Sequence, residues 1–253
     1  MKIHTELVKN KKIGSPISSN LLKHSQEYRV LAILRYLFPN KYNTMVAGES
    51  PDLQDYINSV GIEVVSAVQE NDMKVQSEFS KLHQESDNLK KEKILNKIKE
   101  NKYSIKKIQK DKYIISSFGT IKSEKNVFQN SIRKKRIKIE LYKDKFEKLG
   151  LAIILPAIPT SEAEKNYIRW ILEVRKEKDT FFDFVYIVSN RFCIYYDDLN
   201  GNYKKSFITN NEYLLLSTIA RMTAEGDLDL NSIEWNWILW FKPMKKLVFK
   251  RIV

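Results

Sequence analysis

The pair Pro51-Asp52 and the run Gly61-Ile62-Glu63-Val64-Val65 decide the fold of this chain. The run is rich in β-branched residues and is typical of a strand, and Glu63 interrupts its apolar pattern. An Asp directly after a Pro can begin a neighbouring strand, with its side chain leaving the sheet. The pattern therefore predicts two strands of one hairpin, which bring Asp52 and Glu63 together.

Two carboxylates aimed at one point can hold a divalent cation against a phosphate. Mg²⁺ prefers oxygen ligands and keeps several waters, so few protein ligands suffice. A carboxylate on a mostly buried strand is costly unless it is paired or bound to a cation. Two other interpretations stay open: Pro51-Asp52 is also typical of a turn, and an edge strand with one solvated face would accommodate Glu63.

The net charge of +13 lies almost wholly in the middle of the chain. Residues 81–150 carry 21 Lys and Arg against 9 Asp and Glu, whereas residues 1–80 are neutral and residues 151–253 carry +1. A concentrated basic segment favours a polyanionic partner such as a nucleic acid, although a solvated helical face has the same composition. The predicted nucleic-acid contacts are Arg133, Lys134, Lys135 and Arg136.

Several other classes of function lack the residues that they need. The single cysteine, Cys193, allows no disulfide framework and no Cys-based zinc site, and the three histidines show no metal-ligand spacing. The absence of a glycine-rich phosphate loop argues against ATP or NAD chemistry. No apolar run approaches the roughly 20 residues that cross a bilayer. We therefore expect a soluble, cytoplasmic protein with no membrane partner and no nucleotide cofactor.

The periodicity of the chain predicts an α/β protein with a central β-sheet flanked by helices. We expect a discontinuous α/β core of residues 18–82 and 150–253, and a basic, mainly helical insertion at residues 83–149. Helices are predicted over residues 18–38, 69–102, 126–148, 160–174 and 212–224, strands over 61–67, 113–115, 151–155, 183–187 and 192–196, and terminal strands around Trp235, Trp237 and Trp240.

The segment Pro51-Asp52…Glu63-Val64-Val65 resembles the PD-(D/E)XK nuclease superfamily, whose restriction endonuclease-like core is a mixed sheet with the order α-β-β-β-α-β. The resemblance implies Mg²⁺- or Mn²⁺-dependent cleavage of DNA or RNA, with Asp52 and Glu63 as metal ligands, and of the two nucleic acids we expect DNA. Glu27 on the first helix would be an accessory acid, with Glu49 as its competitor. The enzyme would be a monomer or a homodimer, and the analogy suggests restriction or phage defence.

The chain departs from the family at Val65, where the family has a lysine two residues after the second acid. In divergent members the next helix can supply this lysine, so the resemblance implies Lys74 or Lys81 in its place, with Gln69 as a polar substitute. Two further interpretations stay open. One is a catalytically inactive nucleic-acid-binding protein with the same fold. The other is a helical protein-interaction module formed by residues 69–148.

Overall fold

The chain forms two compact units in this computed structural model. The larger unit comprises residues 19–68 and 121–253, and the smaller unit comprises residues 1–18 and 69–120. The expected core and insertion therefore differ from the observed units, because residues 69–82 belong to the smaller unit and residues 121–149 to the larger. The structure describes residues 19–68, 70–82, 85–101, 103–109, 112–117, 121–155, 161–233, 235 and 248–251.

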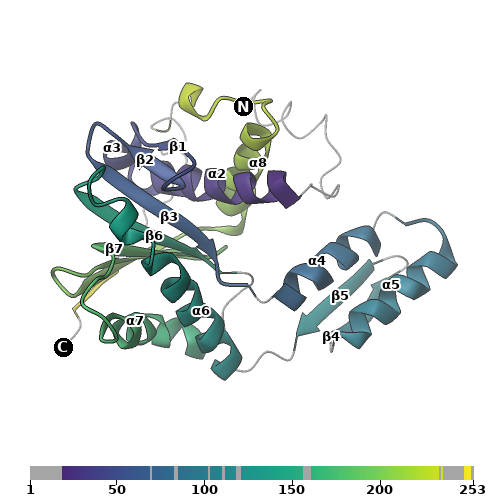
Figure 1. Ribbon diagram of the computed structural model, residues 1–253. Helices are drawn as coiled ribbons and strands as arrows, with labels where there is room; N and C mark the ends of the chain where they lie inside the picture. Colours follow the sequence, from purple (N-terminus) through teal and green to yellow (C-terminus); the bar gives the residue numbers. More distant parts are fainter. Residues whose placement is uncertain are drawn as a thin grey trace. The chain divides into compact units, whose positions relative to one another are not determined.

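The larger unit is built on one mixed β-sheet of eight strands in the order β1-β2-β3-β6-β7-β8-β9-β10 (Figure 1). The pairs β3–β6 and β6–β7 are parallel, and the other pairs are antiparallel. The strands are β1 Val46–Ala47, β2 Leu53–Asp55, β3 Val60–Ser66, β6 Lys148–Ile154, β7 Phe184–Val188, β8 Phe192–Asp197, β9 Asn202–Phe207 and β10 Val248–Arg251.

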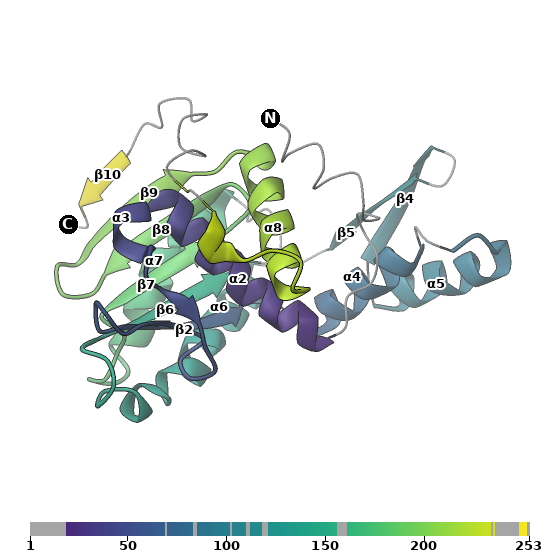
Figure 2. The same ribbon diagram turned by 90° about the horizontal axis from the view of Figure 1, so that it is seen from above.

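Helices cover both faces of this sheet, which confirms the predicted α/β class (Figure 2). Side chains alternate along each strand, so that Ala152 and Ile154 pack with α2 and α8, whereas Leu151 and Ile153 pack with α6 and α7. The helices of this unit are α2 Ser19–Leu37, α3 Pro39–Tyr42, α6 Ile121–Arg136, α7 Ser161–Arg175 and α8 Asn210–Ala224, with the 3-10 turns η1 Ile139–Leu141 and η2 Leu230–Ser232.

Two predicted elements differ from the observed ones. The helix expected over residues 126–148 ends at Arg136, and the turn η1 then leads into β6. Phe146, which was expected to continue the helical stripe, is buried just before β6 instead. Of the three tryptophans expected in terminal strands, Trp235 is helical and buried, and Trp237 and Trp240 lie outside the described residues.

The smaller unit combines two helices with a two-stranded antiparallel sheet. Helix α4 packs on α5, and α5 packs on β4. The buried side chains include Val75, Leu82 and Ile98. This unit is less helical than the sequence predicts, because the chain after α5 forms a hairpin. Its elements are α4 Glu70–Leu82, α5 Asn88–Glu100, β4 Tyr103–Gln109 and β5 Lys112–Ser117.

Across the described residues of both units, no helix has the length and apolar character that crossing a membrane requires.

Candidate functional site

Asp52 and Glu63 lie side by side on the hairpin formed by β2 and β3. Leu53 pairs with Ile62 in the antiparallel register, so the residue before Leu53 lies beside the residue after Ile62. The backbone N–H of Val64 donates a hydrogen bond of 2.7 Å to Oδ2 of Asp52 and fixes that carboxylate. Asp52 is 2% exposed and Glu63 is 1% exposed. The structure therefore brings together two buried carboxylates, which require compensation by positive charge.

The hairpin is held by the buried Asp55 and by the close approach of Pro51 to Gly61. Asp55 accepts hydrogen bonds from the backbone N–H of Asn58 at 3.0 Å and from the hydroxyl of Thr44 at 2.7 Å. Burial opposes ionisation of Asp55, but hydrogen bonds from Asn58 and Thr44 outweigh it and lower its pKa. A Cβ at Gly61 would lie 2.7 Å from Cγ of Pro51. Glycine at this position thus lets the Pro-Asp pair pack against β3.

Lys135 of α6 lies between the two carboxylates. Its Nζ is 3.0 Å from Oδ2 of Asp52 and also contacts Oε2 of Glu63. Because one nitrogen contacts both groups, those two oxygens lie within about 6 Å of each other, the sum of two ordinary hydrogen-bond lengths. The Lys135 side chain is 16% exposed, so solvent ions screen these ion pairs only weakly. Helix α6 packs on β3 and β6, which holds Lys135 in this position.

Two more side chains from the segment after α6 contact Glu63. The hydroxyl of Tyr142 donates a hydrogen bond of 2.6 Å to Oε1, and Nζ of Lys138 lies 3.3 Å from Oε2. Burial and the hydrogen bond to Glu63 raise the pKa of Tyr142 to about 12. Tyr142 therefore stays a neutral donor at ordinary pH. Together with Lys135, these contacts fix the orientation of the Glu63 carboxylate.

Helix α2 contributes a second acid beside Asp52. Glu27 is buried, and its Oε1 lies 3.4 Å from Nζ of Lys23, which is itself 4.0 Å from Oδ1 of Asp52. Nδ1 of His24 lies 3.0 Å from Oε2 of Glu27. Glu27 is thus linked to Asp52 through Lys23. The cluster, defined as Glu27, Asp52, Glu63, Lys23, Lys135, Lys138 and Tyr142, is drawn from α2, the β2–β3 hairpin and the region of α6.

The other acids and lysines predicted for the site lie elsewhere in the chain. Glu49 is exposed in the loop between β1 and β2. Lys74 and Lys81 are exposed on α4, in the smaller unit, where Lys81 pairs with Glu78 at 2.6 Å. Gln69 lies outside the described residues. Within the larger unit, Lys135 supplies the ammonium group that the sequence interpretation assigned to α4.

The basic run at the end of α6 does not form one nucleic-acid contact surface, contrary to the prediction. Lys135 points into the acidic cluster, and Arg136 is buried and donates to a backbone carbonyl of α7. Arg133 forms an ion pair with Glu177. Lys134 is exposed and stays a predicted phosphate contact. Because α6 buries one face against the sheet and α7, three of the four basic side chains contact other parts of the protein.

The apolar periodicity around α6 indicates that Lys135 faces the protein interior, although the basic composition of the segment does not. The buried residues Phe128, Ile132, Ile139 and Tyr142 follow one stripe at spacings of four, seven and three, and Lys135 falls within this stripe, three residues after Ile132. A lysine in an apolar stripe is directed toward the interior. The sequence interpretation named Lys135 only as a nucleic-acid contact, and it did not name Lys138 or Tyr142.

The donor set of the cluster fits a hard divalent cation. Asp52 and Glu63 supply carboxylate oxygens, and Mg²⁺ can complete its coordination with water and phosphate. The described residues contain no group of three or more His, Cys, Asp or Glu side chains placed to hold a metal ion together. Any ion would therefore use these two carboxylates and share them with Lys135.

Comparisons with family models, curated proteins and solved structures find no match for this chain. The interpretation of the cluster depends on its own geometry.

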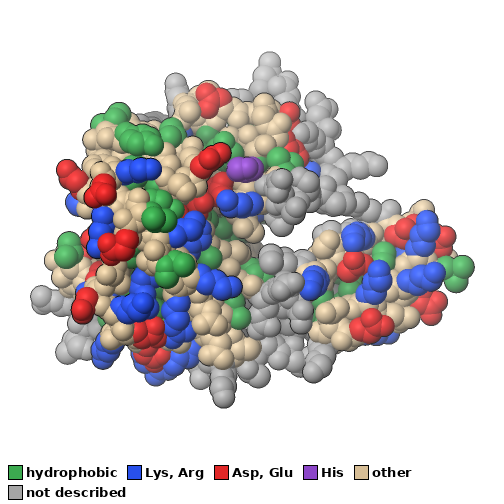
Figure 3. Space-filling view, in the orientation of Figure 1, with side chains coloured by type: hydrophobic (Ala, Val, Ile, Leu, Met, Phe, Trp, Pro, Cys, Tyr) green, Lys and Arg blue, Asp and Glu red, His purple; other side chains and the backbone are tan. Residues whose placement is uncertain are grey.

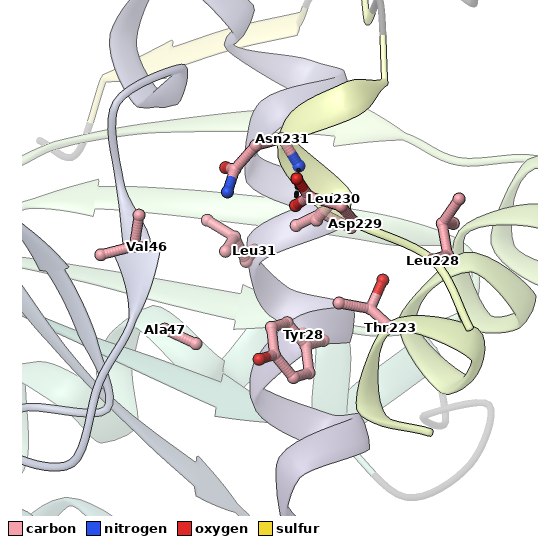
Figure 4. Close-up of a pocket in the computed structure, with 9 residues that line it drawn as sticks. All are labelled: Tyr28, Leu31, Val46, Ala47, Thr223, Leu228, Asp229, Leu230 and Asn231. Atoms are coloured by element: carbon pink, nitrogen blue, oxygen red, sulfur yellow. Dashed lines mark hydrogen bonds between the residues drawn. The ribbon is translucent and has the colours of Figure 1, made fainter. Parts of the chain in front are cut away.

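A cavity of about 280 Å³ lies on the α2 side of the sheet, lined by Tyr28, Leu31 and Val46 and by the segment 228–231 (Figure 4). Polar groups that line it, on Asn231 and Asp229, form hydrogen bonds within the protein. Oδ1 of Asn231 accepts a hydrogen bond of 2.8 Å from the buried Arg35, and Asp229 accepts one of 2.9 Å from the backbone N–H of Asn231. These bonds attach η2 to α2, so we assign the cavity no chemical role.

The variant Tyr142→Phe is expected to lose about 1.5–3 kcal/mol of stability, the worth of a hydrogen bond to a charged group. Because the folded-state pKa of Tyr142 is raised to about 12, the stabilisation is complete below the ordinary pKa of about 10 and is lost as pH rises toward 12. Chemical unfolding at pH 7 and pH 11 measures this difference. Equal stability of the variant and the wild type at pH 7 would show that the hydroxyl does not support Glu63.

Proposed function

We propose that this chain is a Mg²⁺-dependent nuclease of PD-(D/E)XK type that hydrolyses phosphodiester bonds of DNA. The observation that carries the proposal is the pair of buried carboxylates, Asp52 just before β2 and Glu63 on β3, with Lys135 between them. Apart from the short helix α3 and the turn η1, the larger unit begins with the order α2-β1-β2-β3-α6-β6, which corresponds to α-β-β-β-α-β and also supports the proposal. Restriction or phage defence, and the cytoplasmic location that DNA access would require, are part of the proposal.

Lys135 takes the role of the lysine that is missing at position 65. Glu63 and Val65 are two residues apart on β3 and face the same side of the sheet, where Val65 packs against the core that includes Phe128 and Ile132 of α6. A lysine on α6 can reach the same region from above the strand. Its contacts with both Asp52 and Glu63 support this assignment over Lys74 and Lys81.

Each residue of the cluster has a separate role in this proposal. Bound between Asp52 and Glu63, Mg²⁺ would polarise the phosphoryl oxygen, lower the pKa of a water and stabilise the leaving oxygen. The Lys135 ammonium donates a hydrogen bond to the attacking water or to a phosphate oxygen as negative charge develops. The water oxygen bonds to phosphorus and gives up its proton to solvent, the bond to the departing sugar oxygen breaks, and that oxygen takes a proton from solvent to leave as an alcohol. Tyr142 and Lys138 hold Glu63 in place.

Incubation of the full chain with supercoiled plasmid DNA tests the proposal. We expect nicked or linear product with Mg²⁺ or Mn²⁺ and none with EDTA, because EDTA removes the cation that would polarise the phosphoryl group. Parallel reactions with single-stranded DNA and with RNA define the substrate. Intact substrates throughout, at several pH values and with both metals, would contradict the proposal.

A second candidate is a nucleic-acid-binding protein that has the same site but no activity. The observation that favours it is the charge balance of the cluster, in which the acids Glu27, Asp52 and Glu63 face an equal number of lysines. Such a balanced set is stable without a metal ion. This candidate predicts salt-sensitive DNA binding with no cleavage under any of the conditions above.

A further inference from the structure

Helix α5 of the smaller unit carries a stripe of three exposed lysines, Lys90, Lys93 and Lys97. Their spacing of three and four residues places them on one side of the helix. The buried Ile98 and the half-buried Ile94 and Leu95 lie on the adjoining side of the helix. Because this apolar side packs within the unit, the three ammonium groups are directed into solvent. Figure 3 shows several basic side chains over the smaller unit, with acidic ones between them.

Within the part of the chain that the structure describes, the lysine stripe has no ion-pair partner. Among the residues that the structure describes, no acidic group lies within ion-pair distance of these three side chains, whereas Lys81 on α4 has Glu78 as its partner. The stripe spans about 10 Å along the helix axis, at 1.5 Å per residue. Phosphates of a DNA strand repeat about every 3.4 Å along the duplex axis, so the stripe is long enough to follow several of them.

The hairpin after α5 adds positive charge and an aromatic group. Lys106 and Lys107 of β4 are exposed, and Nζ of Lys107 lies 5.9 Å from the ring centre of Tyr113 on β5. The start of α5 is fixed by Asp87, whose side chain accepts hydrogen bonds from the backbone N–H groups of the first turn. The helix and the hairpin therefore present positive charge from a rigid support.

The position of this unit in the chain connects it to the candidate site. The chain leaves the larger unit after β3, which carries Glu63, and returns at α6, which carries Lys135. The lysine stripe is thus inserted between two elements that supply the cluster. A substrate bound to the smaller unit would therefore be connected through the chain to β3, which carries Glu63, and to α6, which carries Lys135.

We propose that the smaller unit binds duplex DNA through α5, with Lys90, Lys93 and Lys97 on the phosphate backbone. This inference rests on the proposed nuclease function for its choice of a DNA substrate. A helix with its side chains is about 10–12 Å wide, which suits the major groove of B-DNA at about 12 Å. The major groove of duplex RNA is too deep and narrow to admit it. The apolar side of α5, which includes the buried Ile98, packs within the unit and is not available to enter an anionic membrane.

The test is binding of a 30-base-pair DNA duplex to the full chain in EDTA, followed by fluorescence anisotropy at several salt concentrations. The triple variant Lys90→Ala, Lys93→Ala, Lys97→Ala is expected to lower the slope of log K against log salt by about 2.7, at about 0.9 per phosphate contact. A control with equal charge loss, Lys99→Ala, Lys176→Ala, Lys178→Ala, removes exposed lysines outside the stripe and should change the slope by less than half as much.

The outcomes separate this inference from the proposed function. Lysine-dependent DNA binding without cleavage by the wild type would leave the inference standing and contradict the nuclease. Cleavage by the wild type, with equal slopes for the triple variant and the control, would overturn the inference alone. Tighter binding to duplex RNA, or to vesicles with anionic lipid, would also overturn it. Circular dichroism melting shows whether both variants remain folded, and single substitutions replace the triple variant if it does not.

Discussion

The variants Asp52→Asn and Glu63→Gln are each expected to lose Mg²⁺-dependent DNA cleavage by at least about 10²-fold, the typical loss when one group that stabilises transition-state charge is removed. Each substitution keeps the size of the side chain and removes one of the two negative charges available to a cation. The amide side chains of the two variants have the shape of the original carboxylates and should fit in their places. Their amide oxygens can still accept hydrogen bonds from Lys135, which contacts both carboxylates in the wild type. Initial rates of plasmid nicking at saturating DNA measure the loss.

Two controls make this result specific. The variant Asp144→Asn also removes one acid from the larger unit, at an exposed position, and should cleave at the wild-type rate. DNA affinity in EDTA should change little in either site variant, because the proposed phosphate contacts of the smaller unit, Lys90, Lys93 and Lys97, lie outside the cluster. Full cleavage by both site variants would remove Asp52 and Glu63 from the reaction.

The variant Lys135→Ala is expected to lose both activity and stability. Removal of the ammonium leaves two buried carboxylates without their shared partner, and breaking a buried ion pair in this way costs about 3–5 kcal/mol. For a domain of this size, each kcal/mol corresponds to roughly 2–4 °C in melting temperature. Cleavage should fall by about 10²–10³-fold, as for the loss of one charge-stabilising donor. Differential scanning fluorimetry and plasmid nicking measure the two effects.

The neighbouring Lys134 is a matched control, because Lys134→Ala removes the same charge from the same turn of α6 at an exposed position. Its melting temperature should equal that of the wild type. Mg²⁺ should raise the melting temperature of Lys135→Ala more than that of the wild type, since the ion no longer shares the carboxylates with an ammonium and binds more tightly. An equal response to Mg²⁺ in the two proteins would contradict a common site for the ion and Lys135.

The carboxylate half of the site could be predicted from the sequence because its signals are local. Glu63 interrupts a run of β-branched residues, and Asp52 follows a proline before that run. In the structure, Asp52 lies directly before β2 and beside Glu63 of β3. Glu27 was predicted from its place on the first helix. It is buried, and Lys23 lies near both Glu27 and Asp52.

The lysine half could not be located in the same way, because residues 69–120 separate β3 from the helix that packs on it. The next helix in sequence after β3 is α4, which belongs to the smaller unit. A prediction based on the order of elements therefore assigned the lysine to Lys74 or Lys81. Lys135 stands in a run of four basic residues, which the sequence interpretation assigned to nucleic-acid contact. Its place in the stripe of Phe128 and Ile132 becomes clear only when the packing of α6 is known.

The end of α6 was mispredicted for a related reason. Apolar residues continue past Arg136, and no glycine or proline occurs before Gly150, so periodicity alone extends the helix to about residue 148. The chain instead turns at η1 and enters β6 at Lys148, where parallel pairing with β3 begins. Tertiary contacts of Tyr142 and Phe146, both buried, override the local helical preference.

Titration of the wild-type chain with Mn²⁺, followed by electron paramagnetic resonance of the free ion, tests most directly whether Asp52 and Glu63 form a metal site. We expect saturable binding of Mn²⁺ by the wild type, competition by Mg²⁺, and a loss of at least about tenfold in affinity in Asp52→Asn and in Glu63→Gln, since metal affinity depends on the charged ligands. Undiminished Mn²⁺ binding in both variants, or no binding by the wild type with and without DNA, would contradict the metal site and with it the proposed nuclease.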